Sequence, residues 1–204
     1  MIDTTPVEFL DQVAQRLIKT NPDVRYAIAQ SPAEIETIYR LRYRTVTEQG
    51  WSKSEDYPDG QERDEYDDEA IHIGCWQGAT LLATIRLILP SARHPLPAET
   101  GYGIQIEPYQ QVVECSRAIV APEYRDRSHE LFFGVLGRSW IESRARGFRE
   151  LCGTMTERII RIHEQGGFVM EILGEPHLYL GAVRYPVKFD IPRSVSKMQQ
   201  MGLL

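Results

Sequence analysis

Charged and polar side chains interrupt an apolar strand at residues 112–120. Glu114, Ser116 and Arg117 stand there among aliphatic residues. A strand that enters a protein core is normally an unbroken apolar run. Burying an unpaired charge in such a strand costs roughly several kcal/mol of folding free energy. Arg86 interrupts a second apolar strand, residues 80–89, in the same way. These interruptions predict either a structural ion pair between Arg86 and Glu114 or a functional site, where Glu114 would take a proton from an amine.

The spacing of apolar residues predicts alternating helices and strands. Helices are expected at residues 6–20, 31–48, 128–145 and 156–165. Strands are expected at residues 24–29, 70–76, 80–89, 112–120, 150–153, 168–173 and 182–189. This order is that of an α/β, GNAT-like (acyl-CoA N-acyltransferase-like) fold, with a mixed central sheet and helices on both faces. Such a fold builds its site where two central parallel strands splay apart, here the strands at 112–120 and 150–153.

We expect three segments: an N-terminal helical extension at residues 1–24, a GNAT-like domain at 25–193 and a C-terminal tail at 194–204. The net charge of −6 argues against nucleic acid as a partner. No apolar run reaches the about 18 residues needed to span a membrane, and the N-terminus has no signal-peptide pattern, so a cytoplasmic location is expected. The three cysteines have no metal-ligand spacing and are expected to be small buried residues.

An acidic segment, Trp51 to Asp68, precedes the first long strand. Asp64 and Asp67 are three residues apart, so both face one direction if the segment forms a turn of helix. Paired carboxylates suit an ammonium group, a sulfonium group or a metal, and no His or Cys stands at ligand spacing, so no metal is expected. Trp51 could cover a cation or stack on a base. The alternative is an ordinary hydrophilic loop.

The turn at residues 120–129 bears on the acyl donor. Coenzyme-A-dependent GNAT enzymes have a glycine-rich turn at this place, whose backbone N–H groups bind the pyrophosphate. Here the turn has no glycine, and Asp126 and Glu130 would repel phosphate. The thioester of a carrier protein therefore fits better than free coenzyme A. Ser116 and Arg117 could position a carboxylate or phosphate.

The residues together resemble the acyl-homoserine-lactone (autoinducer) synthase family, over about residues 25–190. The matching pattern is Arg42, Trp51, Glu62-x-Asp64-x-Tyr66-Asp67, Ala83-x-x-Arg86-Leu87-x-x-Pro90 and Glu114-x-Ser116-Arg117. The resemblance implies acyl transfer from acyl carrier protein to the amine of S-adenosylmethionine, followed by lactonisation to a quorum-sensing signal. No cofactor is implied, because S-adenosylmethionine is a substrate and the donor carries the acyl-phosphopantetheine group.

The resemblance also implies roles. Glu114 would help to deprotonate the amine, with Arg86, Ser116 and Arg117 beside it as catalytic residues. Arg42, Trp51, Asp64 and Asp67 would shape the substrate loop, with Arg42 and Arg86 as counter-charges. Backbone N–H groups of Ala118, Ile119 and Val120 could stabilise the thioester oxyanion. A basic cluster would suit an acidic carrier protein; its members are Arg138, Arg144, Arg146, Arg149, Arg158 and Arg161.

The sequence departs from the family pattern in several places. The usual aromatic residues are replaced by Val46 and by Ala118, and the run Val120 to Arg125 looks more like the related N-acyl amino acid synthases. Those enzymes share the fold and the carrier-protein donor but acylate a free amino acid. The alternatives to a lactone synthase are therefore an N-acyl amino acid synthase and a non-catalytic GNAT-like binding module.

Overall fold

The computed structural model describes residues 5–202. Its contacts divide the chain into two compact units that interleave along the sequence. Among the described residues, the loop unit comprises 14–88 and 115–142, and the Glu114 unit comprises 5–13, 89–114 and 143–202. Strand β4 (Val112–Val120) contributes Val112–Glu114 to the Glu114 unit and its remaining residues to the loop unit.

Three antiparallel strands form the sheet of the loop unit: β1 (Arg25–Ile28), β2 (Ile71–Gln77) and β3 (Thr80–Ile88). Gly78 adopts a φ of +59° in the tight turn between β2 and β3, a conformation that glycine tolerates best. The register of this hairpin shifts between Cys75 and Trp76, which places His72 directly opposite Arg86. The end of β4 lies beside β3, where the Ala121 N–H donates to the Leu82 carbonyl (2.8 Å).

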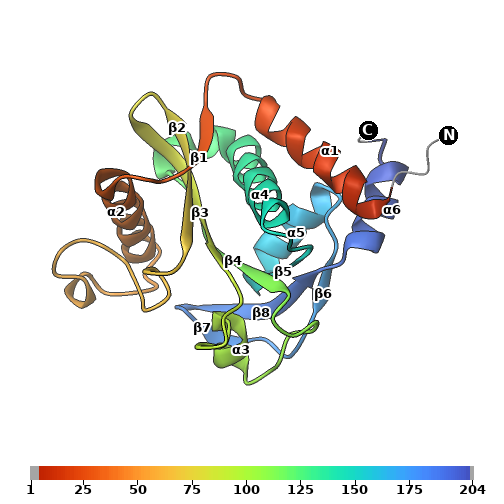
Figure 1. Ribbon diagram of the computed structural model, residues 1–204. Coiled ribbons are helices and arrows are strands. Elements are labelled where there is room, and N and C mark those ends of the chain that lie inside the picture. The colour runs from red at the N-terminus through yellow and green to blue at the C-terminus, as the bar shows by residue number, and fades with distance from the viewer. Residues whose placement is uncertain (1–4, 203–204) are drawn as a thin grey trace. The chain divides into compact units, whose positions relative to one another are not determined.

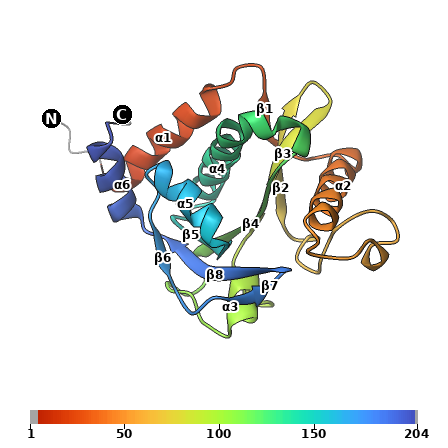
Figure 2. The same ribbon diagram turned by 180° about the vertical axis from the view of Figure 1, so that it is seen from behind.

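Helices cover both faces of this sheet (Figures 1 and 2). The predicted Ser31 caps the N-terminus of helix α2 (Pro32–Glu48): its side chain accepts from the Glu34 N–H, while the Glu34 carboxylate accepts from the Ser31 N–H. Its Ile38 and Leu41 pack with Trp76 in one apolar cluster. Helix α4 (Ser128–Ala145) lies on the opposite face. A Cβ at Gly134 would stand 2.2 Å from the Tyr26 hydroxyl oxygen, so this close approach requires glycine.

The strands of the Glu114 unit pair in both directions. Strand β5 (Glu150–Met155) runs parallel to the start of β4, with Glu114 opposite Cys152, and antiparallel to β8 (Ala182–Phe189). The short strands β6 (Met170–Ile172) and β7 (His177–Tyr179) also pair with β8. Helices α3 (Pro97–Tyr102) and α5 (Glu157–Gln165) contact β5. Helix α6 (Ile191–Gln200) buries Val195 and Met198.

Most predicted elements are present, including the N-terminal helix α1 (Pro6–Lys19) and β4 over its full predicted length. Short 3-10 turns, Ser54–Asp56 and Pro122–Arg127, interrupt two predicted loops. Helices α3 and α6 and strand β7 were not predicted. Cys75 and Cys152 are buried as expected, whereas Cys115 is only half-buried. Within residues 5–202, no helix is long and apolar enough to cross a membrane. The predicted division into three segments stays a prediction.

Candidate functional site

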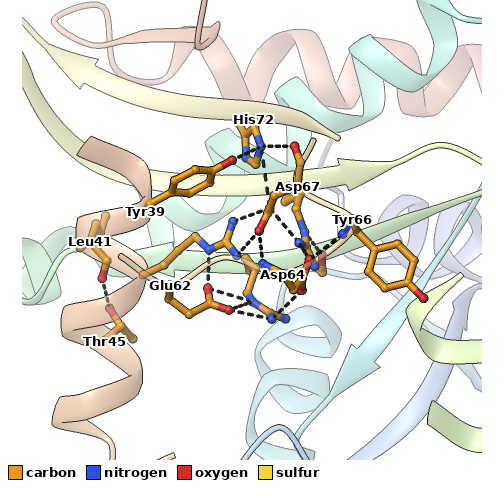
Figure 3. A network of polar contacts seen from close by, with 12 residues as sticks. Tyr39, Leu41, Thr45, Glu62, Asp64, Tyr66, Asp67 and His72 are labelled. Carbon is orange, nitrogen blue, oxygen red and sulfur yellow. Dashed lines mark hydrogen bonds and ion pairs between the residues drawn. The ribbon is translucent and has the colours of Figure 1, made fainter. Parts of the chain in front are cut away.

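Three arginines and three carboxylates form one network of ion pairs in the loop unit (Figure 3). Each arginine comes from a different element: Arg42 from α2, Arg86 from β3 and Arg117 from β4. The carboxylates all come from the acidic loop: Glu62, Asp64 and Asp67. Formal charges therefore cancel within the network, which lowers the cost of burying them.

Arg42 is the most enclosed member. Its guanidinium binds Asp67 through two parallel hydrogen bonds of 2.7 and 2.8 Å, and its Nε donates to Glu62 (2.5 Å). The side chain has no exposed surface, and its guanidinium carbon lies 5.2 Å from the ring centroid of Tyr39. The predicted role of Arg42 as a counter-charge of the loop agrees with this geometry.

Arg86 binds both Asp64 and Asp67, the two aspartates whose three-residue spacing predicted that they face one direction. Its Nη1 donates to Asp64 (2.6 Å) and to Asp67 (2.8 Å), and its Nε donates to Ser116 Oγ (3.0 Å). The loop is closed further because the Asp64 N–H donates to Asp67 Oδ2 (2.8 Å). Both aspartates therefore point in one direction, as predicted. The buried Nη2 of Arg86 has no hydrogen-bond partner among residues 5–202.

Arg117 and Asp64 are the most accessible members of the network. The Arg117 side chain is 14% exposed and that of Asp64 25%, whereas each of the other four is at most 4% exposed. Arg117 donates to Glu62 (2.8 Å) and to Asp64 (3.1 Å). Its φ of +54° is uncommon for a residue with a side chain, and backbone strain of this kind concentrates at functional sites.

The network holds its acids ionised. Burial alone would raise the pKa of Asp67, but hydrogen bonds from Arg42 and the charges of Arg42 and Arg86 hold that pKa well below its usual range. Burial would likewise raise the pKa of Glu62, and the charges of Arg117 and Arg42 lower it. Asp67 thus has its oxygens occupied by arginines and a backbone N–H, which makes it a support of the loop more than a ligand for an incoming cation.

Sequence reasoning missed three residues of this cluster as site residues: Glu62, Tyr39 and His72. The buried His72 Nε2 lies 3.2 Å from the Asp67 carbonyl oxygen and 3.4 Å from the Tyr39 hydroxyl (Figure 3). Burial lowers the pKa of His72, partly offset by Asp67. The position of Glu62 in the quoted acidic pattern could have identified it, whereas His72 reaches the cluster through the bulge in the hairpin.

Glu114 lies in the other unit. Its side chain is buried, and its Oε2 accepts a hydrogen bond from the Ala98 N–H in the first turn of α3 (2.8 Å). The sequence predicted Arg86 as its partner across strands, and that pair stays a prediction. Within residues 5–202 no group of three or more His, Cys, Asp or Glu side chains is placed to hold a metal ion.

The other predicted residues differ in exposure. Trp51 is half-buried and lies just beyond the end of α2. Its backbone N–H donates to the Val46 carbonyl (2.9 Å). On β4, Ala118 is exposed, and Ile119 and Val120 are half-buried. Their predicted contact with a thioester oxyanion stays a prediction.

The arginines of the predicted basic cluster fall into two groups, those that form ion pairs within the protein and those that are exposed. Arg138 pairs with Glu142, Arg144 with Asp11 and Arg161 with Glu157. Arg146, Arg149 and Arg158 are exposed, and the latter two form no ion pair with any residue that the structure describes.

The known proteins to which this chain is similar support the GNAT architecture. The family described as "Acetyltransferase (GNAT) domain" matches residues 41–135. No curated protein matches the chain. Among solved structures, TofI in a ternary complex with an inhibitor and MTA is 24% identical, with a TM-score of 0.67 over 87% of this chain and 96% of that one. BjaI, a CoA-dependent acyl-homoserine lactone synthase solved with SAM and isopentyl-CoA, is 23% identical, with a TM-score of 0.63 over 82% and 81%.

A third similar structure is FeeM, an N-acyl amino acid synthase from uncultured soil microbes. It is 16% identical, with a TM-score of 0.67 over 90% of this chain and 99% of that one. The chain has the GNAT fold. The predicted fold class is therefore confirmed, with antiparallel pairs β1–β2 and β2–β3 and a parallel pair β4–β5. At the level of the fold, the likeness to acyl-homoserine lactone synthases is confirmed as well.

Proposed function

We propose that this GNAT-fold chain is an N-acyltransferase that acylates the amine of S-adenosylmethionine and forms an acyl-homoserine lactone. The observation that carries the proposal is the closed network of Arg42, Arg86 and Arg117 with the loop carboxylates. These are residues of the pattern that resembles the autoinducer synthases. Three elements thereby fix the acidic loop in one conformation, which is what a preorganised acceptor site requires.

The accessible edge of the network suits the acceptor's amino acid group. An α-amino acid carries an ammonium and a carboxylate on one carbon, and Asp64 and Arg117 present an anion and a cation 3.1 Å apart. Arg117 donates hydrogen bonds to Glu62 and Asp64 through Nε and Nη2, so Nη1 can donate to a carboxylate oxygen of the acceptor. Asp64 has a quarter of its side chain exposed toward solvent. Trp51 would cover the sulfonium group by a cation–π contact.

The chemistry proceeds in two balanced steps. The ammonium group first loses one proton to Glu114, directly or through one water. The neutral amine nitrogen then attacks the thioester carbonyl carbon, so that a C–N bond forms and the C–S bond breaks. The departing thiolate takes the second proton from that nitrogen and leaves as the thiol. The carboxylate oxygen then attacks the γ-carbon that bears the sulfonium, which closes the lactone and expels neutral methylthioadenosine.

Acyl carrier protein is the donor that we propose. The segment Pro122–Arg127 that leads into α4 contains no glycine and carries Glu123, which binds Arg44 through two hydrogen bonds (2.6 and 2.9 Å), and the exposed Asp126. A segment without glycine lacks the backbone freedom that a pyrophosphate-binding turn uses, which disfavours the phosphates of free coenzyme A. Arg149 and Arg158 supply exposed positive charge for an acidic carrier protein. Since BjaI is described as a CoA-dependent synthase, the assay must compare both donors.

A purified-protein assay tests acceptor and donor together. The chain is incubated with acyl carrier protein or coenzyme A thioesters of one acyl chain, and with S-adenosylmethionine or a mixture of free amino acids. We expect methylthioadenosine release only with S-adenosylmethionine, faster with the carrier protein, and at least about a hundredfold slower in Glu114→Gln. Equal turnover in Glu114→Gln would reject Glu114 as the base.

An N-acyl amino acid synthase is the second candidate. The likeness to FeeM, at a TM-score equal to that of TofI, and the departures at Val46 and Ala118 favour it. In the same assay this function gives an acylated amino acid and a free thiol without methylthioadenosine. The third candidate, a non-catalytic binding module, would bind an acceptor but release no thiol with any donor.

A further inference from the structure

Helix α3, which the sequence analysis predicted to be part of a loop, lies beside the hairpin of β7 and β8 (Figures 1 and 2). The Tyr179 hydroxyl donates to the Pro97 carbonyl (3.3 Å), and the Tyr102 hydroxyl donates to the Arg184 carbonyl (2.7 Å). His177 Nε2 lies 3.1 Å from the Gly101 carbonyl oxygen. A Cβ at Gly101 would stand 2.6 Å from the Tyr179 ring, so the ring packs where only glycine leaves room.

The same peptide group links this hairpin to Glu114. The Pro97 carbonyl that accepts from Tyr179 and the Ala98 N–H that donates to Glu114 (2.8 Å) belong to one planar peptide unit. In a trans peptide the carbonyl and the N–H point in opposite directions. Tyr179 and Glu114 therefore stand at the two ends of a chain of two hydrogen bonds. Hydrogen bonds in such a chain polarise and strengthen one another.

We propose that Tyr179 is a positioning residue for Glu114, acting through the Pro97–Ala98 peptide group. The proposal rests on the function proposed above, in which Glu114 is the base. A hydrogen bond to a carboxylate favours its ionised form, and the Ala98 N–H also holds Oε2 of Glu114 in place. The Tyr179 hydroxyl makes that N–H a better donor and keeps the first turn of α3 on Glu114.

Two conservative variants separate this relay from simple support of α3. Tyr179→Phe keeps the ring on Gly101 and removes the donor to Pro97, whereas Tyr102→Phe removes a bond at the other end of α3. We expect Tyr179→Phe to lower kcat about threefold to tenfold, to leave the KM for the acceptor unchanged and to move the acid limb of the pH–kcat profile to higher pH. Tyr102→Phe should change kcat less than twofold. Leu178→Ala, an exposed neighbour on β7, is the control that should change nothing.

Hydrogen exchange of the Ala98 amide gives a readout that needs no activity. We expect exchange to be faster in Tyr179→Phe than in the wild type and unchanged in Leu178→Ala. An unchanged pH profile and unchanged exchange in Tyr179→Phe would overturn the proposal, as would an equal effect of Tyr102→Phe on both. If the wild type transfers no acyl group at all, the proposed function fails, while the Ala98 exchange rates still decide whether the relay exists.

Discussion

The two units bury charge in different ways. In the loop unit, Arg42 and Arg86 lie inside the protein because carboxylates from one loop neutralise them. In the Glu114 unit, one oxygen of the buried Glu114 is held by a neutral backbone N–H. An ion-pair network of this kind fixes the shape of the loop and resists change of protonation, whereas the hydrogen bond to Glu114 connects that carboxylate to the first turn of α3. We infer that the network of the loop unit fixes the acidic loop, and that Glu114 is the base of the proposed reaction.

The largest expected effect comes from breaking the network at its centre. Arg42→Met leaves Asp67 and Glu62 short of a partner, and loss of one side of a buried ion pair typically costs about 3–5 kcal/mol. Urea unfolding at pH 7 measures this loss. Arg40→Met is the matched control, because Arg40 lies two residues earlier on α2 in an exposed pair with Glu36, worth about 0.5 kcal/mol. Equal losses in the two variants would show that the network does not stabilise the fold.

A smaller effect is expected at the accessible edge, and on activity more than on stability. Arg117→Lys removes the fork that holds the loop and the acceptor carboxylate, and we expect kcat/KM for S-adenosylmethionine to fall about tenfold to a hundredfold. Methylthioadenosine release measures it. Arg63→Lys is the control, since Arg63 is exposed and pairs only with Asp59 among the residues described. Unchanged kcat/KM in Arg117→Lys would place the acceptor elsewhere.

Acid should weaken the network in a predictable direction. The pKa of Asp67 and that of Glu62 are lower in the folded state than in the unfolded chain. Their contribution to stability is therefore complete above the unfolded values of about 4 and is lost as pH falls below them. In Asp67→Asn, unfolding between about pH 4 and 2 should show a shallower pH slope, by up to about 1.4 kcal/mol per pH unit. A slope as steep as that of the wild type would contradict the lowered pKa of Asp67.

The smallest effect concerns the exposed arginines of the Glu114 unit. Reversing Arg149 and Arg158 to Glu should raise the KM for acyl-carrier protein severalfold at low salt, and less at high salt because exposed charges are screened. Arg16→Glu on α1 is an exposed control. If the KM does not change, the carrier protein docks on another face.

The sequence predicted elements well where local physics decides them. The capping pattern at Ser31 and the apolar periodicity of α4 gave their helices because both depend on neighbouring residues. Helix α3 was missed because its proline and glycine are typical of a loop, whereas contacts with β7 and β8 hold it in place. The C-terminal α6 was missed for a similar reason, since the Val169 N–H donates to Ser194 from a distant segment (2.7 Å).

The site was predicted in part. The spacing of Asp64 and Asp67 correctly placed both on one face, because that depends on a single turn of the chain. The partnership of His72 with this cluster depends on a one-residue bulge in the β2–β3 hairpin. Such a bulge changes which residues face each other without a clear mark in the sequence.

Mass spectrometry of lipid extracts from cells that express the chain tests the central claim most directly. Cells that express Glu114→Gln serve as the matched control. The account predicts an acyl-homoserine lactone in the first extract and its loss in the second. An acylated free amino acid in place of the lactone, or an extract that does not differ from that of Glu114→Gln, would contradict it.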